Sequence, residues 1–241
     1  MSSKILMFHD VIDSTSYISG FQNSGALIYK LDIPKFESII SFCGNNVVYT
    51  FDDGGISFYD VIAPILDRNR LTGIFCITTS MIGSDGFMNS SQIKSLNDSG
   101  HQIISHSHSH FSDIAFRSKE TIANEWRISK EIIESITEKE CLIASIPAGS
   151  ISFRLLNILE EVGYKEVYTS IPFKGSFKFK SLIIYGRFAI YRGFDSESLS
   201  RIDNFFYRLY LNIRFFIFLL LRYLLGEKYY ILRNFILKKI V

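Results

Sequence analysis

Short apolar runs alternate with helix-type patterns through the first 190 residues of this 241-residue chain, and this alternation constrains the fold more than any other feature. Runs of β-branched and aromatic residues that end in Gly, Asp or Ser are typical of buried strands. Stretches with apolar residues three and four positions apart are typical of helices that pack on one face. Strands that alternate with helices predict a parallel sheet with helices outside, so the sequence predicts an α/β fold.

These patterns give the expected elements. Strands are expected near 4–9, 46–51, 72–78, 102–105, 141–145, 166–169 and 182–191. Helices are expected near 57–68, 90–97, 118–137 and 151–162. Functional residues of parallel α/β sheets lie at the carboxyl ends of the strands, so the segments that directly follow each expected strand are the candidates for a functional site.

Two carboxylates stand at the end of one expected strand. Val47–Phe51 is apolar and β-branched, and Asp52 and Asp53 follow it directly, before two glycines. Adjacent residues at a strand end point in different directions, so one carboxylate can face a metal while the other faces water or substrate. Taken alone, the segment is more typical of a solvated turn that caps the next helix.

Three histidines follow a second apolar run. His106, His108 and His110 begin where the short run 103–105 ends. They share one face on a continued strand, and on a helix His106 and His110 still share one, so either geometry lets these two approach one ion. Imidazole binds zinc and other late first-row metals well. Because both segments leave an expected strand, they favour metal-assisted hydrolysis over the alternative of an adventitious histidine cluster.

The two segments resemble the first two motifs of the polysaccharide deacetylases, the NodB-homology group or carbohydrate esterase family 4. Residues 50–54 match the motif TFDDG letter for letter, and residues 106–110 fit H-[S/T]-x-x-H about fifty residues later. The resemblance implies a distorted (β/α) barrel and a general base at Asp52, with Ser107 supporting the second loop. It also implies three metal ligands, which are Asp53, His106 and His110.

The family's third motif, R-x-P-[Y/F]-G or a variant without the arginine, is matched only in part. Pro147 and Gly149 fit the motif. Ser145 stands where arginine often stands, and Ala148 replaces the aromatic residue. The resemblance therefore implies that the backbone turn is kept, with the Ala148 N–H as a candidate oxyanion donor, while one groove wall is changed. A plain strand-to-helix turn is the alternative.

Two further residues are candidates for roles that these motifs leave open. A late L-x-H motif supplies the general acid in the family, and this chain has no histidine after His110. His9, in a segment similar to the YHxV of many members, is the candidate replacement, with a buried structural histidine as the alternative. Arg187, in a segment similar to the GRI-x-V of some relatives, is the candidate for orienting Asp52, with an ordinary salt bridge as the alternative.

Composition and charge narrow the classes of partner and compartment. The net charge of +2 and the lack of a basic arm or nucleic-acid motif exclude a nucleic-acid partner. The three cysteines are widely spaced in apolar runs, which predicts reduced core thiols. His9 and Asp10 cut short the apolar run at the N-terminus, so no signal peptide is expected and the prediction is a cytoplasmic protein, with the inner face of the membrane as an alternative site.

The last forty residues differ in character from the rest. Aromatic and aliphatic residues dominate 205–221, and five Arg or Lys residues follow by position 239 against Glu227 alone. One expectation is a basic, aromatic interfacial segment that makes peripheral membrane contact through 205–241. The other is a pair of helices, broken near Gly226, that packs on the domain or on a second subunit. The predicted division is therefore a catalytic domain over 1–195 and a helical extension over 196–241.

The resemblance implies a metal-dependent hydrolase that removes an N-acetyl group from an amino sugar or glycan precursor in polysaccharide or glycolipid biosynthesis. Zinc is the metal expected from the ligand types, with cobalt, nickel or manganese as alternatives. The expected partner is a carbohydrate that bears an acetamido group. Two alternatives stay open, an amidase acting on a small substrate and a degenerate domain that binds carbohydrate or a partner without catalysis.

Overall fold

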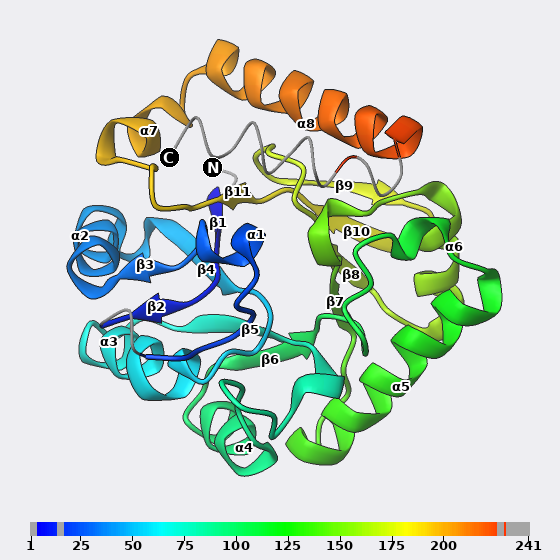
Figure 1. Ribbon diagram of the computed structural model, residues 1–241, viewed down its shortest axis with the longest axis horizontal. Coiled ribbons are helices and arrows are strands. Elements are labelled where there is room, and N and C mark those ends of the chain that lie inside the picture. Colours follow the sequence, from blue (N-terminus) through cyan, green and yellow to red (C-terminus); the bar gives the residue numbers. More distant parts are fainter. Residues whose placement is uncertain (1–3, 14–16, 226–228, 230–241) are drawn as a thin grey trace.

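The computed structural model describes residues 4–13, 17–225 and 229. Within them a nine-stranded mixed sheet curls around a central axis, with helices on its outer side (Figure 1). The strand order is β11-β1-β4-β5-β6-β7-β8-β10-β9, and the pairing is parallel throughout except between β10 and β9. The predicted α/β fold with a distorted barrel is confirmed. The sheet is a half-barrel, because its two edge strands, β11 and β9, do not pair with each other.

The strands of the main sheet are β1 (Lys4–Phe8), β4 (Val47–Phe51), β5 (Gly73–Ile77), β6 (Gln102–Ser105), β7 (Ile143–Ser145), β8 (Glu166–Tyr168), β9 (Ser176–Phe179), β10 (Leu182–Tyr185) and β11 (Phe188–Ala189). A small parallel pair consists of β2 (Val11–Ile12) and β3 (Leu31–Asp32). The α-helices are α1 (Ser24–Leu27), α2 (Ile33–Cys43), α3 (Ala63–Arg68), α4 (Ser90–Asp98), α5 (Lys119–Thr137), α6 (Phe153–Val162), α7 (Ser196–Arg201) and α8 (Phe205–Leu225). Short helical turns are η1 (Gly44–Asn46), the π-helical η2 (Phe58–Ile62), η3 (Thr79–Met81), η4 (Ile114–Phe116) and η5 (Pro147–Gly149).

Polar side chains cap the N-termini of the outer helices that pack on the sheet. The Ser118 side chain accepts a hydrogen bond from the third residue of α5, and Ser152 does the same for α6. Asn89 and Gln92 form a reciprocal capping box at the start of α4. These caps satisfy backbone N–H groups that have no partner inside the helix, so the helices begin where the sequence offers a Ser or Asn.

Stacked phenylalanines fill the space beneath the carboxyl ends of β1, β4 and β5. The rings of Phe8 and Phe51 lie 5.4 Å apart, and those of Phe51 and Phe75 lie 5.1 Å apart. All three side chains are buried. Phe8 immediately precedes His9 and Phe51 immediately precedes Asp52, so a close-packed aromatic layer fixes the backbone from which both side chains project.

The expected single strand over 182–191 is wrong. β10 pairs with β8 and β9, the chain then turns at Gly186 and Arg187, and β11 pairs with β1 at the opposite end of the sheet order. The reason is that the Arg187 side chain enters the interior, where its guanidinium finds a carboxylate. The antiparallel β9 is also a departure from the expected all-parallel sheet, and it is the largely exposed edge strand of a hairpin with β10.

Near the C-terminal end of the described residues, one long helix, α8, lies beside the barrel. Figure 1 shows α8 crossing one side of the molecule, and Asn212 ties it to the loop after β8 by donating to the Pro172 carbonyl at 2.8 Å. The expected break near Gly226 lies outside the described residues. No helix in the described ranges has both the length and the apolar character needed to cross a membrane. The three cysteines are free and buried, as predicted.

Candidate active site

Neighbouring parallel strands deliver the candidate residues to one edge of the sheet. His9 follows β1, Asp52 follows β4 and His106 follows β6, and Ser145 is the last residue of β7. The backbone N–H of Asp52 donates to the Phe8 carbonyl at 2.9 Å, so β1 and β4 stay paired up to the site. Carboxyl ends of parallel strands meet at the same edge, which explains how residues a hundred positions apart come together here.

The three candidate metal ligands form a compact group of donor atoms. One ligand atom each from Asp53, His106 and His110 lies within 4.8 Å of the others. Oδ1 of Asp53 is 3.5 Å from Nε2 of His106 and 3.2 Å from Nε2 of His110. Donors about 2.1 Å from one tetrahedral ion stand about 3.4 Å apart, so these separations suit a single zinc-like ion.

The hydrogen bonding of this group also fits a cation. Nδ1 of His106 lies 2.9 Å from the carbonyl oxygen of Ser145. A carbonyl only accepts, so Nδ1 carries the proton, and in the neutral ring Nε2 presents a lone pair towards Asp53. Oδ1 of Asp53 is buried and accepts no hydrogen bond from the described residues. A buried carboxylate that faces imidazole nitrogens without a hydrogen bond is the arrangement that a metal ion satisfies.

The loops that carry these ligands adopt unusual backbone conformations. Asp53, Ser107 and His110 have φ values of 93°, 63° and 53°. Residues other than glycine seldom adopt a positive φ, and such strain concentrates at functional sites. The Ser107 hydroxyl accepts a hydrogen bond from the His110 N–H at 3.1 Å, which closes the loop. His108 points elsewhere, with Nδ1 2.9 Å from the hydroxyl of Thr79.

Asp52 meets Arg187 in a buried two-point ion pair. The guanidinium donates from Nη1 to Oδ1 at 2.7 Å and from Nη2 to Oδ2 at 2.8 Å. Its remaining N–H groups reach Thr169 O, Thr50 Oγ1 and Ser145 Oγ at 2.9 to 3.2 Å. The Ser145 hydroxyl in turn donates to Asp52 Oδ1 at 3.2 Å. All five donors of Arg187 are therefore satisfied, which an arginine with 0% exposure requires.

The charges around the site set its protonation. Burial alone would raise the pKa of Asp52, but the Arg187 guanidinium outweighs it and holds the pKa far below the usual range. The pKa of Asp53 is also lowered, since the imidazoles of His106 and His110 outweigh its burial. Asp53 in turn raises the pKa of His110 against the opposing effect of burial. Both carboxylates are therefore ionised at neutral pH.

A second buried network supports the aspartate loop from below. Asp10 is buried, accepts hydrogen bonds from the hydroxyls of Ser19 and Ser57, and lies 3.7 Å from Nζ of Lys30. A Cβ atom at Gly55 would lie 2.0 Å from Oδ1 of Asp10, so the chain can pass here only as glycine. This role of Asp10 was not predicted from the sequence, although the pair of glycines after Asp53 was a signal that another group approaches the backbone closely.

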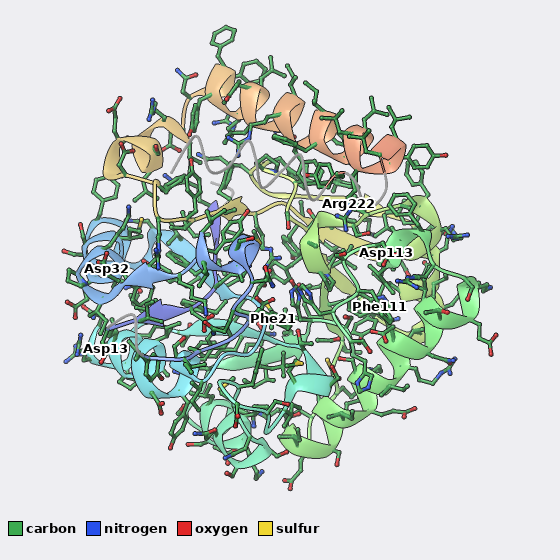
Figure 2. The ribbon with its side chains drawn as sticks, viewed as in Figure 1. Asp13, Phe21, Asp32, Phe111, Asp113 and Arg222 are labelled. Carbon is green, nitrogen blue, oxygen red and sulfur yellow. The ribbon has the colours of Figure 1, made fainter. Side chains whose placement is uncertain are left out.

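The candidate acid and the third motif line a cavity of about 950 Å³ together with Asp52 and Asp53. His9 stacks on Tyr29 at 4.6 Å between ring centres, and its Nδ1 is buried without a hydrogen-bond partner among the described residues. Burial lowers the pKa of His9, against the opposing effects of Asp53 and Asp52. Figure 2 places Phe21 near the centre of the ring of strands, where its ring lies 5.0 Å from that of His110.

The segment Pro147–Gly149 lies at the same cavity. Ala148 and Gly149 line it, whereas Pro147 is buried behind them. Ala148 has φ 52° and ψ 20°, so the tight turn implied by the motif is present without the aromatic residue. The Ala148 carbonyl accepts a hydrogen bond from Nη1 of Arg222 at 2.9 Å, and Figure 2 shows Arg222 on α8. Helix α8 thus forms one wall of this cavity, which was not predicted from the sequence.

Comparisons with known proteins agree with this geometry. The sequence pattern of the family described as polysaccharide deacetylase matches residues 41–167, which is more than half of the chain. No curated protein matches the sequence. The fold is similar to that of the deacetylase PplD of Streptococcus pyogenes, with a TM-score of 0.70 and 19% identity over 84% of this chain and 98% of the other.

Two further solved structures are similar in fold. The polysaccharide deacetylase BC0361 of Bacillus cereus has a TM-score of 0.71 and 18% identity over 84% of this chain and 69% of its own. A de-N-acetylase from Aggregatibacter actinomycetemcomitans has a TM-score of 0.69 and 16% identity over 84% of this chain and 100% of its own. The likeness to these structures supports the same fold at low identity, and the match over 41–167 identifies the family. The chain belongs to the polysaccharide deacetylase family.

Proposed function

We propose that this protein is a metal-dependent hydrolase that removes the acetyl group from an N-acetylated amino sugar or glycan precursor in polysaccharide or glycolipid biosynthesis. The observation that carries the proposal is the group of Asp53, His106 and His110 beside an ionised Asp52 that is not one of the three. Three ligands and a neighbouring carboxylate are the parts that metal-assisted amide hydrolysis needs.

The ligand set supports a metal in this role. Asp53, His106 and His110 would hold one divalent ion, with zinc favoured by two imidazoles and one carboxylate, and cobalt, nickel or manganese as alternatives. When bound, such an ion supplies positive charge that polarises an amide carbonyl and favours hydroxide over water. The Ser145 carbonyl holds His106 in the tautomer that such binding requires.

Asp52 is the proposed proton acceptor for the attacking water. Arg187 keeps it ionised and fixes its plane through two hydrogen bonds, so its free lone pairs stay aimed at the same place. The lowered pKa makes the carboxylate a weak base, and its orientation is therefore the main contribution of the pair. Arg187 thus replaces the arginine that the third motif lacks at Ser145.

The other proposed roles concern the leaving group and the oxyanion. His9 is the proposed acid that protonates the departing amine, since it lines the cavity with both aspartates and its Nδ1 has no partner among the described residues. A lowered pKa makes a protonated imidazole a stronger acid, although a smaller fraction carries the proton at neutral pH. The turn of Pro147, Ala148 and Gly149 is the proposed oxyanion and substrate wall.

We also propose the division of labour along the chain. Residues 1–195 carry the catalytic groups, and residues 196–241 form an extension whose helix α8 closes one wall of the cavity. The proposed location is cytoplasmic, at the inner face of the membrane through peripheral contact of 205–241, where an acetylated precursor is available.

The test is acetate release from a panel of N-acetylated sugars by the purified protein, with and without added Zn²⁺ or Co²⁺. Wild type is expected to release acetate only when metal is added. Asp52→Asn is expected to bind metal but to release no acetate. His106→Ala is expected to lose metal binding. His108→Ala is the matched control, because it lies in the same loop but bonds to Thr79 and lies outside the ligand group.

The outcomes separate the proposal from its two alternatives. Stoichiometric metal binding without release from any sugar, but with release from small amides, would favour an amidase. Metal binding with no hydrolysis of either class would favour a carbohydrate-binding domain. Equal metal binding by wild type and His106→Ala would remove the basis of the metal site.

A further inference from the structure

The outward side of α8 carries a continuous row of large apolar side chains. The row consists of residues that are each at least 44% exposed, Phe206, Leu209, Tyr210, Ile213, Phe216, Ile217, Leu220, Tyr223 and Leu224. Their spacing of three and four positions keeps them on one side of the helix. The 21 residues of α8 make this row about 30 Å long. Monomeric proteins in water rarely expose a continuous apolar surface of that size.

Contacts on the other side of α8 fix the direction of this row. Asn212 donates to Pro172 O at 2.8 Å, and Arg222 donates to Ala148 O at 2.9 Å. The ring of Phe215 lies against Gly149, where an added Cβ would approach it to 3.2 Å. Because these contacts engage both halves of the helix, α8 cannot rotate its outward row towards the barrel without breaking them.

The charges on α8 show which kind of partner suits the row. The helix contains three arginines, at 208, 214 and 222, and no acidic residue. Arg214 is exposed, and its guanidinium lies 5.9 Å from the ring centre of Phe218 on the same helix. A second copy of the chain would bring the same exposed Arg214 to a symmetric interface without an acidic partner from either helix. Arg208 and Arg222 donate to backbone carbonyls of the protein, which leaves Arg214 as the exposed charge beside the row. An anionic lipid surface offers both apolar chains for the row and a phosphate for Arg214.

We propose that the outward row of α8 docks on the surface of a bilayer that contains anionic lipid. The helix lies in the plane of the interface, with its apolar row among the acyl chains and the exposed Arg214 at the phosphates. Phenylalanine and tyrosine, which make up four members of the row, suit this boundary.

This position has a consequence for the substrate, and the consequence rests on the proposed function. The opposite side of α8, through Tyr207, Phe215 and Phe218, lines the cavity that holds Asp52 and Asp53, and Tyr210 and Arg214, next to that side, also line it. One helix diameter, about 10 Å, therefore separates the bilayer from this cavity. The substrate class that this arrangement favours is an amphiphile, an acetamido sugar linked through an anionic group to a lipid that stays in the membrane.

The experiment measures co-sedimentation of the full chain with two kinds of vesicle, phosphatidylcholine alone and phosphatidylcholine mixed with phosphatidylglycerol. Wild type is expected to bind the mixed vesicles, and the triple variant Ile213→Gln, Phe216→Gln, Leu220→Gln to bind them at least about tenfold more weakly. The matched control is Phe42→Gln, Ile128→Gln, Phe153→Gln, which removes three exposed apolar side chains from other helices and is expected to bind as wild type does. Arg214→Gln, which keeps the apolar row, is expected to weaken binding about fivefold.

Three results would overturn the proposal. Wild type that stays in the supernatant with both vesicles has no membrane-docking surface. A triple variant that binds as wild type does removes α8 from the contact. Wild type that sediments as a dimer, with the triple variant as a monomer, makes the row a subunit interface.

The same variants separate this inference from the proposed function. Asp53→Ala is expected to lose metal and keep vesicle binding, so failure of catalysis leaves the docking result intact. The triple variant is expected to release acetate from a soluble N-acetylated sugar as wild type does, and to lose about tenfold activity on the same sugar anchored in vesicles. Equal activity on the anchored sugar would refute the substrate class while leaving the docking measurement to stand by itself.

Discussion

Replacing Arg187 with methionine tests the buried ion pair at the centre of the candidate site. Arg187→Met keeps most of the side-chain volume but removes five hydrogen-bond donors and leaves the Asp52 carboxylate, 3% exposed, without its counter-charge. Removing one partner of a buried ion pair costs about 3 to 5 kcal/mol. Such a loss is a large share of the stability of an ordinary domain, about 5 to 15 kcal/mol.

The assay is urea unfolding at pH 7 of wild type, Arg187→Met, Asp52→Asn and the double variant. The double variant is expected to lose less unfolding free energy than the two single variants lose together, by about 2 kcal/mol, because neither partner is left alone. Arg187→Lys keeps the charge but offers one point of contact, so its unfolding free energy should lie between those of wild type and Arg187→Met.

The pH dependence gives a second measure of the same pair. The folded-state pKa of Asp52 lies below its usual 3.8, so its contribution to stability is present above that pH and is lost as the pH falls. The difference in unfolding free energy between wild type and Arg187→Met should therefore shrink in acid. A methionine variant within about 1 kcal/mol of wild type at pH 7, the value of an exposed pair, would refute the reasoning.

Three further predictions concern Ser145, His110 and Gly55. Ser145→Arg places a second guanidinium beside Arg187 in a fully buried position and should destabilise the fold by about 3 kcal/mol or more, whereas Ser145→Arg combined with Arg187→Ser should recover part of that loss in the same unfolding assay. The raised pKa of His110 means that a metal must displace a proton in acid, so zinc affinity measured against a chromophoric chelator should fall about tenfold for each pH unit below that pKa, and a flat profile would contradict it. Gly55→Ala forces a Cβ atom to within 2.0 Å of Asp10 Oδ1 and should lower the unfolding free energy by about 1 to 3 kcal/mol, measured by urea or heat.

The main strands and the metal-type cluster could be predicted because their signals are local. Residues 47–51 and 102–105 are compact apolar runs, and the functional side chains follow each run directly. The α2 helix was missed although Asp32 supplies a cap and Pro34 a preferred first-turn residue, so there the signal existed and was overlooked.

Other features depend on tertiary contacts that a sequence pattern cannot carry. The run from 182 to 191 is apolar on both sides of Gly186 and Arg187, so nothing local marks the point where the chain leaves one strand neighbour and joins another. The pairing of Arg187 with Asp52 could be suggested only from the resemblance. The side of α8 that faces the cavity was equally hidden, because a helix that is apolar almost all round does not indicate which face is covered.

The position of β1 between β4 and β11 has a consequence for how the chain folds. One edge of β1 meets β4 early in the sequence, but its other edge waits for β11, about 180 residues later. Contacts of such long range are slow to form, and until they do β1 remains an unpaired edge that other chains can join. The residue just before β11 is Arg187, so the segment that closes this edge also brings the counter-charge for Asp52. The pairing of β11 with the edge of β1 and the neutralisation of Asp52 are therefore one late event, and a nascent chain that stalls before it is expected to aggregate rather than to persist as a partly formed enzyme.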